Sequence, residues 1–532
     1  MKVGQPAEAD QSHVIGASNA GGAGTQPLAP FVKTCALIEL FLLGLFAVAP
    51  VGGVSQSISP LARSWPILLA PARALFGDAL VSGSVPPDRE WPALALYAAL
   101  LIGASCAAAL VVITARSLIT PERRHLRLAL IGALVLGVTL LLLPALPSDD
   151  VFSYILYGRI SAVHHANPLV LTPANFPHDP FLSLVFWRGV RSVYGPAWLL
   201  LSGGVTRLAQ GLGGSLTAYV LLFKLLGLTA HLANVALIWV ILGRLAPRRQ
   251  VFGTLLYAWN PLCLLEFCAS AHNDAVMLTF ALAAVYLLLR EQEVAALVMI
   301  GLSIATKYVL LVLLPLYLIL VARRFLARNE TLGRVVGAVA WRLAVVVAIV
   351  GVTALPYWDG ARTFGSILYS PPTQQLDNSP MEALSWPLRA LIQALGVGHT
   401  GAQMFADNGL KVVGLLLFAL IWLRLLLATR DTQSMLRGWA WALFAYAVIA
   451  SGWFWPWYVT WVVVFVALLP WGDLTVATLL LAGGVLTLYG FQPLYASPVY
   501  GLRAYIAFGP AVGYLIWRWR ETLSKPFTND AP

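Results

Sequence analysis

Long apolar segments, separated by short polar ones, recur along almost the whole of this chain. They cover residues 34–54, 91–114, 128–146, 217–243, 250–268, 275–290, 294–306, 309–321, 341–357, 409–427, 438–452, 458–470, 474–490 and 501–518. An apolar stretch of about 18 residues or more is typical of a transmembrane helix. Inside a bilayer only helices and closed barrels satisfy every backbone polar group, and no alternating strand pattern is present. The sequence therefore predicts an all-α, polytopic transmembrane helical bundle of about 13 to 15 spans.

The distribution of charge supports a membrane protein and excludes a nucleic-acid-binding one. Hydrophobic residues make up 59% of the chain and charged residues only 11%, against roughly a quarter charged in soluble domains. The net charge of +11 is concentrated in short stretches between apolar segments, at 116–127, 244–249, 323–334, 424–437 and 518–525. Basic loops of this kind are typically cytoplasmic. A nucleic-acid partner would require a solvated basic domain, and none is present.

The basic loops also predict a topology in the plasma membrane. With both termini in the cytoplasm, the regions 148–194, 271–274, 358–408 and 453–458 fall on the outer face. Residues 1–30 are rich in Gly, Ala, Ser and Gln and predict a disordered cytoplasmic tail; residues 31–520 form one membrane domain, and 521–532 a second tail. We interpret 195–211 as re-entrant or interfacial. The span count stays open there and at 294–321, which can be read as one crossing or two.

An acidic pair, Asp149 and Asp150, stands where the apolar run 128–146 ends. Ser148 and the two acids would cap a helix beginning near residue 151, which is the structural interpretation. A carboxylate at a membrane edge is also placed to act as a general base toward an acceptor hydroxyl. Both interpretations can hold together.

Other polar residues interrupt apolar sequence in the same way. His272, Asn273 and Asp274 stand between two apolar runs, either as a simple turn or as a second acidic site. Lys307 lies within an apolar segment, where it either snorkels to the surface or neutralises a phosphate. Arg159, Arg188 and Arg191 are alternative phosphate ligands.

Metal chemistry is not indicated by this sequence. His164, His165 and His178 show no metal-ligand spacing, and the four cysteines all lie in apolar segments without the spacing of a metal or disulfide framework. We therefore predict no metal site and no cofactor, although the sequence does not test metal dependence.

Trp453, Phe454, Trp455, Trp457 and Tyr458 form the densest aromatic cluster. Membrane proteins carry aromatic belts at both interfaces, which explains part of this cluster. A belt scatters its aromatic residues over many helix ends, whereas here five fall within six positions. We interpret the cluster as a wall for a sugar ring or an isoprenoid chain.

An ordered set of short motifs resembles the polyprenol-phosphate-mannose-dependent α-1,6-mannosyltransferases of the GT-C superfamily of integral-membrane glycosyltransferases. The matching positions lie between residues 128 and 470 and comprise Ser148 to Tyr154, Gly158, Asn167-Pro168, Tyr194-Gly195-Pro196, Trp259-Asn260-Pro261, Ala271 to Asp274, Thr306-Lys307-Tyr308 and Trp455 to Tyr458. The family has Gly where this chain has Ala271. It has a single acid that maps onto Asp150, so Asp149 is an additional acid and the choice between the two stays open.

The resemblance implies a GT-C-like fold, a polyprenyl-phosphate sugar donor and a glycan or glycolipid acceptor on the outer face, as in lipoglycan assembly of the cell envelope. We expect Asp150, Asp149 and Asp274 to be catalytic, and Lys307, Arg159 and Arg191 to bind the donor phosphate. The substrate-binding residues expected on the same basis are Tyr154, Asn167, Tyr194, His272, Asn273, Trp455, Trp457 and Tyr458. The expected reaction is a single displacement with inversion. The alternative is a transporter or flippase for a lipid-linked or sugar substrate; the acceptor, the sugar and the oligomeric state stay open.

Overall fold

The chain is folded almost entirely into helices. The structure, a computed structural model, describes residues 28–50, 58–77, 87–365, 375–491, 494 and 497–524. Within these ranges there is no strand, only isolated bridges, which confirms the prediction of an all-α protein. The helices are α1 (Ala29–Val48), α2 (Pro60–Ser64), α3 (Ala70–Phe76), α4 (Pro87–Ala115), α5 (Arg123–Leu141), α6 (Asp150–Ala162), α7 (Pro196–Gly211), α8 (Leu216–Leu245), α9 (Gln250–Ala258), α10 (Pro261–Leu264), α11 (Asp274–Leu288), α12 (Glu293–Thr306), α13 (Leu314–Leu326), α14 (Leu332–Ala354), α17 (Pro380–Ala394), α18 (His399–Ala428), α19 (Thr432–Ala445), α20 (Tyr458–Val466), α21 (Asp473–Leu486), α22 (Leu488–Phe491) and α23 (Arg503–Ser524).

Fewer helices are long enough to cross a membrane than the predicted 13 to 15 spans. In the described part of the chain 9 helices are long and apolar enough, or up to 10 if the bent pair Pro247–Ala258 and Pro261–Ala269 counts as one span. Each predicted apolar segment overlaps a helix, but α11, α12 and α20 have only 15, 14 and 9 residues. A helix of 15 residues is only about 22 Å long, against a hydrocarbon core of about 30 Å. The membrane-spanning character is therefore confirmed, with a smaller set of full-length spans.

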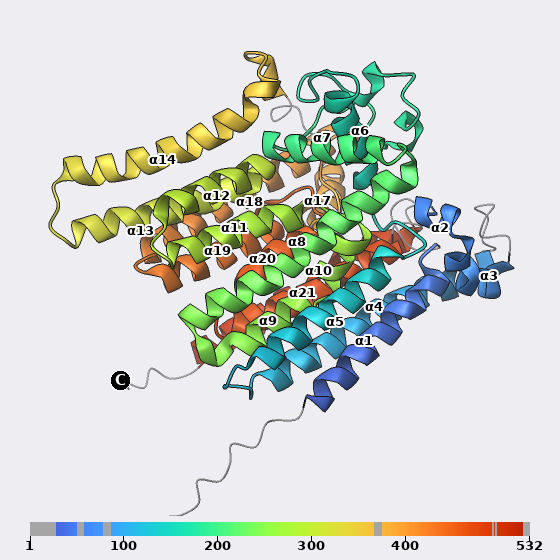
Figure 1. Cartoon of the computed structure of the whole chain (residues 1–532), viewed down its shortest axis with the longest axis horizontal. Helices are drawn as coiled ribbons and strands as arrows, with labels where there is room; N and C mark the ends of the chain where they lie inside the picture. Colours follow the sequence, from blue (N-terminus) through green and yellow to red (C-terminus); the bar gives the residue numbers. More distant parts are fainter. Residues whose placement is uncertain are drawn as a thin grey trace, which may run out of the picture.

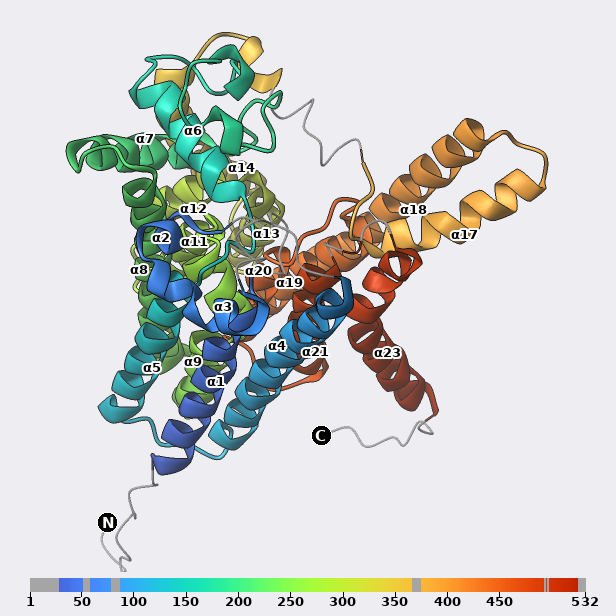
Figure 2. The ribbon, with the colours of Figure 1, turned by 90° about the vertical axis from the view of Figure 1, so that its right-hand side faces the viewer.

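Most of the long helices run side by side, and α6 and α7 lie together at one end of this bundle (Figures 1 and 2). Helix α1 packs on α4, α11 packs on both α8 and α12, and α12 packs on α14. Segment 195–211 forms α7, which lies across the ends of the neighbouring helices (Figure 2). Region 148–194 thus forms a helical cap with α7, not an open loop.

The second predicted outer loop, 358–408, is largely helical where the structure describes it. Ser379 caps α17, because its side chain accepts a hydrogen bond from the backbone N–H of Glu382 at 3.2 Å, and Pro380 occupies the first turn. Helix α18 begins at His399, packs against α17 and projects with it from the bundle (Figure 2). Residues 380–394 and 399–408 of this predicted outer region are therefore helical, and residues 366–374 lie outside the described residues.

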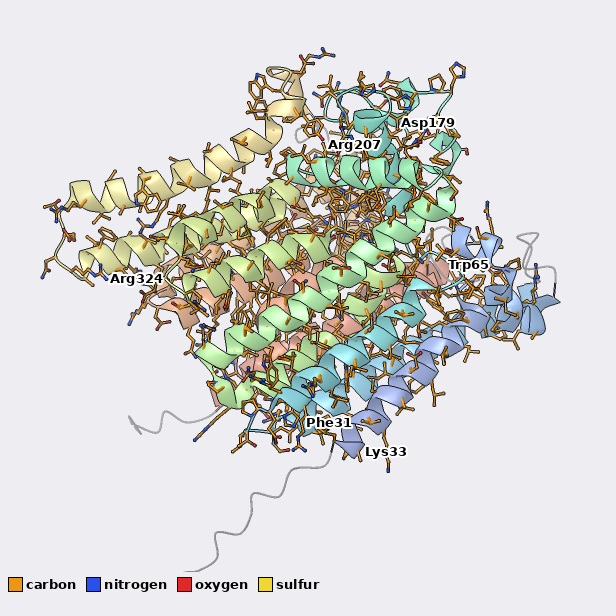
Figure 3. All side chains as sticks on the ribbon, viewed as in Figure 1. Phe31, Lys33, Trp65, Asp179, Arg207 and Arg324 are labelled. Atoms are coloured by element: carbon orange, nitrogen blue, oxygen red, sulfur yellow. The ribbon has the colours of Figure 1, made fainter. Side chains whose placement is uncertain are left out.

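Basic residues gather at the end of the bundle opposite α6 and α7. Figure 3 labels Arg324 and Lys33 near that far end, and Asp179 and Arg207 beside the cap. The connections between α4 and α5 and between α13 and α14, both rich in arginine, lie there as well (Figures 1 and 2). Of the predicted tails, residues 1–27 and 525–532 lie outside the described residues.

Charged side chains inside the bundle are hydrogen-bonded. Glu293 of α12 pairs with Arg342 of α14 at 2.7 Å. Lys224 donates a hydrogen bond to the carbonyl of Leu141 at 2.9 Å. The partners of Glu266 belong to the candidate site.

Candidate active site

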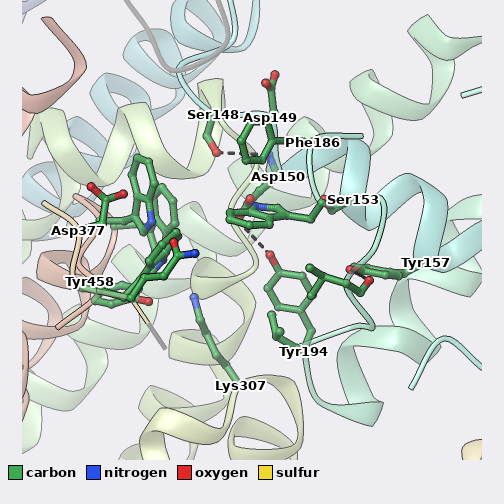
Figure 4. Close-up of a pocket in the computed structure, with 17 residues that line it drawn as sticks. Ser148, Asp149, Asp150, Ser153, Tyr157, Phe186, Tyr194, Lys307, Asp377 and Tyr458 are labelled. Carbon is green, nitrogen blue, oxygen red and sulfur yellow. Dashed lines mark hydrogen bonds between the residues drawn. The ribbon is translucent and has the colours of Figure 1, made fainter. Parts of the chain in front are cut away.

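A cavity of about 410 Å³ lies beneath the cap (Figure 4). It is bounded by the beginning of α6, the segment 186–194, the break between α12 and α13, the residues before α17, and the segment before α20. Its lining residues are Ser148, Asp149, Asp150, Ser153, Tyr157, Phe186, Trp187, Val190, Val193, Tyr194, Lys307, Gln375, Asp377, Trp453, Trp455, Trp457 and Tyr458. Segments more than 300 residues apart in sequence therefore meet at one site.

Asp150 is the first residue of α6, where the partial positive charge of a helix N-terminus favours an ionised carboxylate. Its Oδ2 accepts a hydrogen bond from the Tyr194 hydroxyl at 2.9 Å. Burial and the nearby Asp150 charge raise the pKa of Tyr194 well above its usual value, so this hydroxyl remains a donor. The Asp150 side chain is 19% exposed, and the Asp149 carboxylate points away from Lys307 in Figure 4.

Behind Asp150 lies a buried imidazole. His272 Nδ1 is 3.8 Å from Asp150 Oδ2 and 3.3 Å from the Tyr154 hydroxyl. On the other side of the ring, Nε2 lies 3.2 Å from Glu266 Oε2, and Glu266 Oε1 accepts a hydrogen bond from Tyr489 at 2.6 Å. The imidazole is therefore held between a carboxylate at the cavity and a fully buried one.

The break between α9 and α11 positions His272. Pro261 cannot continue a helical hydrogen-bond ladder, and the Asn260 side chain caps α10 by accepting from the N–H groups of Leu262 and Cys263 at 3.1 and 3.3 Å. The chain then passes through a π-helix, Leu265–Ala269, a feature often found at functional sites. Ala271 follows in the left-handed region at φ 60°, a conformation that favours glycine.

Lys307 reaches the cavity from the break between α12 and the 3₁₀ segment Tyr308–Leu313. Its Nζ donates to both carboxylate oxygens of Asp274, at 2.8 and 2.9 Å, and its side chain is 17% exposed. Asp274 is fully buried and also accepts a hydrogen bond from the indole N–H of Trp461. Asp274 is thus the counterion of Lys307 and lies behind it, not in the cavity.

Tryptophan rings form one continuous wall of the cavity. Trp455 and Trp457 stack with their planes at 4° and their centroids 5.3 Å apart. Trp457 also stacks on His272 at 4.0 Å, and Trp453 bridges Trp455 at 6.0 Å and Trp187 at 5.7 Å. The wall that the sequence suggested is therefore present, with Trp187 as an additional member.

Asp377 lines the same cavity, with its side chain 28% exposed. Its backbone N–H donates to the carbonyl of Gly452 at 2.8 Å, and its carbonyl accepts from Phe454 N–H at 2.9 Å. Burial raises the pKa of Asp377 to about 6; the charge of Glu382 acts in the same direction, and that of Arg503 opposes it.

Several residues expected in the site lie elsewhere. Arg159 is buried in an ion pair with Asp179 at 2.8 Å, and Asn167 donates to the carbonyl of Tyr357 at 2.6 Å and accepts from Leu169 N–H. Arg191 lies beside Gly365 and does not line the cavity. Tyr154 and Asn273 are buried behind the lining. The two arginines are thus not donor-phosphate ligands in this arrangement, and Asn167 organises the cap.

Sequence reasoning missed Asp377, Gln375, Trp187 and Glu266. An acid or amide in a polar loop carries no periodic signal, and only the fold brings residue 377 beside residue 453. Glu266 interrupts an apolar run, which is a signal in the sequence that could have identified it. No group of three or more His, Cys, Asp and Glu side chains able to hold a metal occurs within the described ranges.

Comparison with known proteins identifies relatives. Residues 68–323 match the family described as "Alpha-(1->6)-mannopyranosyltransferase, N-terminal domain". Alpha-(1->6)-mannopyranosyltransferase A of Mycobacterium tuberculosis is 25% identical over 326 residues, which cover 59% of this chain and 60% of that protein. A probable alpha-(1->6)-mannopyranosyltransferase of Mycolicibacterium smegmatis is 32% identical over 182 residues, or 33% of this chain and 31% of that protein.

A second M. tuberculosis alpha-(1->6)-mannopyranosyltransferase is 32% identical over 163 residues, covering 29% of this chain and 26% of that protein. The chain therefore matches 60% or less of the length of each of these relatives. The family match includes Asp150, Asp274 and Lys307, whereas Asp377 and the aromatic wall of 453–458 lie beyond it.

Proposed function

We propose that this chain, of which residues 68–323 match the alpha-(1->6)-mannopyranosyltransferase family, transfers mannose from a polyprenyl-phosphate donor to a glycan or glycolipid acceptor at the outer face of the plasma membrane. The observation that carries this proposal is the presence of a carboxylate, Asp150, and an ammonium, Lys307, in one aromatic-walled cavity. The family match over residues 68–323 favours a transferase over the alternative of a transporter or flippase.

Lys307 binds the donor phosphate in this proposal. An ammonium has three N–H donors, and two hydrogen bonds to Asp274 leave one for a phosphate oxygen. The rings of Tyr458 and Trp461 lie 5.6 and 5.3 Å from Nζ and shield this region from water. A positive charge in a partly buried site stabilises the negative charge that grows on the departing phosphate.

Asp150 acts as the general base. The acceptor hydroxyl gives its proton to Asp150 and its oxygen forms a bond to the anomeric carbon, while the bond from that carbon to the phosphate oxygen breaks. Polyprenyl phosphate leaves with the bonding electron pair, and the anomeric configuration inverts. Nearby carboxylates also stabilise the oxocarbenium-like transition state, as they do in glycoside hydrolysis.

His272 and Tyr194 hold the base in place. Tyr194 donates to Asp150 without neutralising it, and the imidazole lies on the far side from the substrate. His272 and Glu266 are therefore positioning residues, not catalytic ones.

Purified protein in nanodiscs tests the proposal, with radiolabelled polyprenyl-phosphate-mannose as donor and short α-mannosides as acceptors. Asp150→Asn is expected to lower transfer by roughly a hundredfold or more, because general-base catalysis contributes about 10²–10⁴ in rate. Asp149→Asn is the matched control: it removes a neighbouring charge at the same cavity while the Asp150 contacts to Tyr194 and His272 remain, and it should retain most activity. Full activity in Asp150→Asn would exclude the assigned base, and no transfer by wild type with any donor or acceptor would exclude the reaction.

A further inference from the structure

Asp377 has no part in the chemistry assigned above, although it is fixed firmly in the cavity wall. The backbone of Asp377 is bound on both sides by the segment that carries the aromatic wall, through Gly452 and Phe454. The 453–458 segment and the residues before α17 are therefore joined by backbone hydrogen bonds. A carboxylate that lies beside tryptophan rings and faces a cavity is placed to bind a ligand.

A buried guanidinium fixes the Asp377 side chain. Arg503, at the start of α23, is 2% exposed and lies 3.3 Å from Asp377 Oδ1. The same guanidinium donates to both oxygens of Glu382 at 2.6 Å and to the side-chain oxygen of Asn378 at 2.8 Å, and it stacks on Tyr500 at 3.7 Å. Arg503 orients Asp377 but does not saturate it, since a carboxylate can accept about four hydrogen bonds.

We propose, building on the function proposed above, that Asp377, Trp453 and Trp187 form the subsite that binds the acceptor sugar. The carboxylate accepts hydrogen bonds from neighbouring hydroxyl groups of one hexose, and the tryptophan rings pack against its apolar face. In a ligand pocket lined mainly by apolar and aromatic side chains, a small number of polar groups usually fixes the orientation of the ligand.

The location of these residues assigns them to the acceptor instead of the donor. The donor phosphate is bound at Lys307, which extends from the bundle helices toward Asp150 (Figure 4). Trp187 belongs to the cap and Asp377 to the segment before α17, so both come from connections between helices. Phe186, next to Trp187, is 72% exposed. A lipid-linked donor enters from the bilayer, whereas a glycan approaches through the cap.

The charge of the cavity restricts the chemistry of this acceptor. Among the described residues, the carboxylates of Asp149, Asp150 and Asp377 line it together with the ammonium of Lys307, which also pairs with Asp274. An acidic or phosphorylated acceptor sugar beside Asp377 would be repelled by its carboxylate. The subsite therefore fits a neutral hexose with free neighbouring hydroxyls, such as the terminal mannose of a mannoside chain.

Steady-state transfer with the donor and the acceptor varied separately tests this subsite. Asp377→Asn should raise the KM for an α-mannoside acceptor by about ten- to a hundredfold, because the hydrogen bonds that the acceptor makes to a charged partner are weakened. The KM for the donor should stay within about twofold, and kcat should change little. Direct binding of the acceptor to the full-length protein, measured without donor, should weaken by the same factor.

Glu382→Gln is the matched control. Glu382 binds the same guanidinium but does not line the cavity, so its loss should leave the acceptor KM unchanged near pH 7.5. Equal effects of the two variants would assign Asp377 a structural role and overturn the subsite. If wild type is active and Asp377→Asn has unchanged kinetics, or a changed KM for the donor only, the subsite is rejected and the transferase function stands. If wild type binds the acceptor normally but is inactive, the transferase function alone is rejected.

Discussion

Three aspartates in or beside one cavity have three different electrostatic partners, and this difference assigns their roles. Asp274 is neutralised by Lys307 and buried, so it cannot reach a substrate. Asp150 accepts a hydrogen bond from a neutral hydroxyl and lines the cavity, which is why we propose it as the base. Asp377 shares a guanidinium with Glu382, and burial raises its pKa to about 6. Similar side chains therefore differ in function through their neighbours alone.

The raised pKa of Asp377 predicts a pH-dependent affinity for the acceptor. As the pH falls through about 6 the carboxyl gains a proton and accepts hydrogen bonds less well, so the acceptor KM should rise on the acid side. The charged or titratable groups that face it are Glu382, Arg503 and, lining the same cavity, Asp149, Asp150 and Lys307; Lys411 lies beside Gly452. In wild type, the acceptor KM measured at pH 5 should be about tenfold higher than the acceptor KM measured at pH 8.

Two variants separate Asp377 from the other acids. In Asp377→Asn this part of the pH profile should be absent, because the amide does not titrate. Glu382→Gln removes a charge that raises the pKa of Asp377, so the rise should move to lower pH. Identical KM profiles for wild type and Asp377→Asn would contradict the prediction.

Residues that interrupt an apolar run were the ones that sequence reasoning could find. Lys307 and Asp150 each stand out against apolar sequence, and both line the cavity. Arg159 and Asn167 gave a similar signal, but they stabilise the cap through Asp179 and Tyr357. A polar residue near a membrane helix must find a partner, and the sequence does not tell a structural partner from a substrate.

Broken helices place the reactive groups. The break before Tyr308 ends α12 at the cavity through Lys307, and α11 begins next to His272, which lies behind Asp150; the bend of 50° between Pro247–Ala258 and Pro261–Ala269 leads into the π-helix before His272. The apolar segments were found in the sequence because their composition is sufficient to identify them. Their lengths as spans were overestimated, because a helix that ends at an active site does not need to cross the bilayer.

The cap is joined to the Lys307 break by one close contact, at Gly195. Its N–H donates to the carbonyl of Thr306 at 3.2 Å, and a Cβ at this position would lie 2.0 Å from the carbonyl oxygen of Ala305. Gly195→Ala should therefore push the cap away from Lys307, lowering stability by about 1–3 kcal/mol and transfer more steeply. Thermal unfolding and transfer assays in nanodiscs measure both.

Gly189→Ala is the control for this contact. Gly189 lies in the same cap segment, but a Cβ there would meet nothing within 4 Å. Its stability and activity should stay close to those of wild type. Equal losses of stability and activity in both variants would show that the cap tolerates no added side chain at either position. The contact at Gly195 would then not explain the loss in Gly195→Ala.

At the scale of the whole molecule, polar and apolar surfaces are segregated along the bundle. Long helices such as α14 and α18 expose many leucine and valine side chains, as a lipid-facing surface requires, while the arginine-rich connections lie at the end opposite the cap. The positive-inside rule places those connections in the cytoplasm. This prediction supports the proposal that the cavity lies in the outer half of the protein and takes a lipid-linked sugar from the outer leaflet.

Cysteine labelling of intact cells tests this orientation. In a variant lacking Cys35, Cys106, Cys263 and Cys268, a single cysteine at His178, exposed on the cap, should react with a membrane-impermeant maleimide added outside. A cysteine at Arg328, exposed between α13 and α14, should react only after the membrane is permeabilised. Retained transfer activity in both variants confirms that each is folded. The reverse labelling pattern would place the cavity, with the proposed donor and acceptor sites, in the cytoplasmic half. A reaction at the outer face would then be excluded, even if Asp150 is the base.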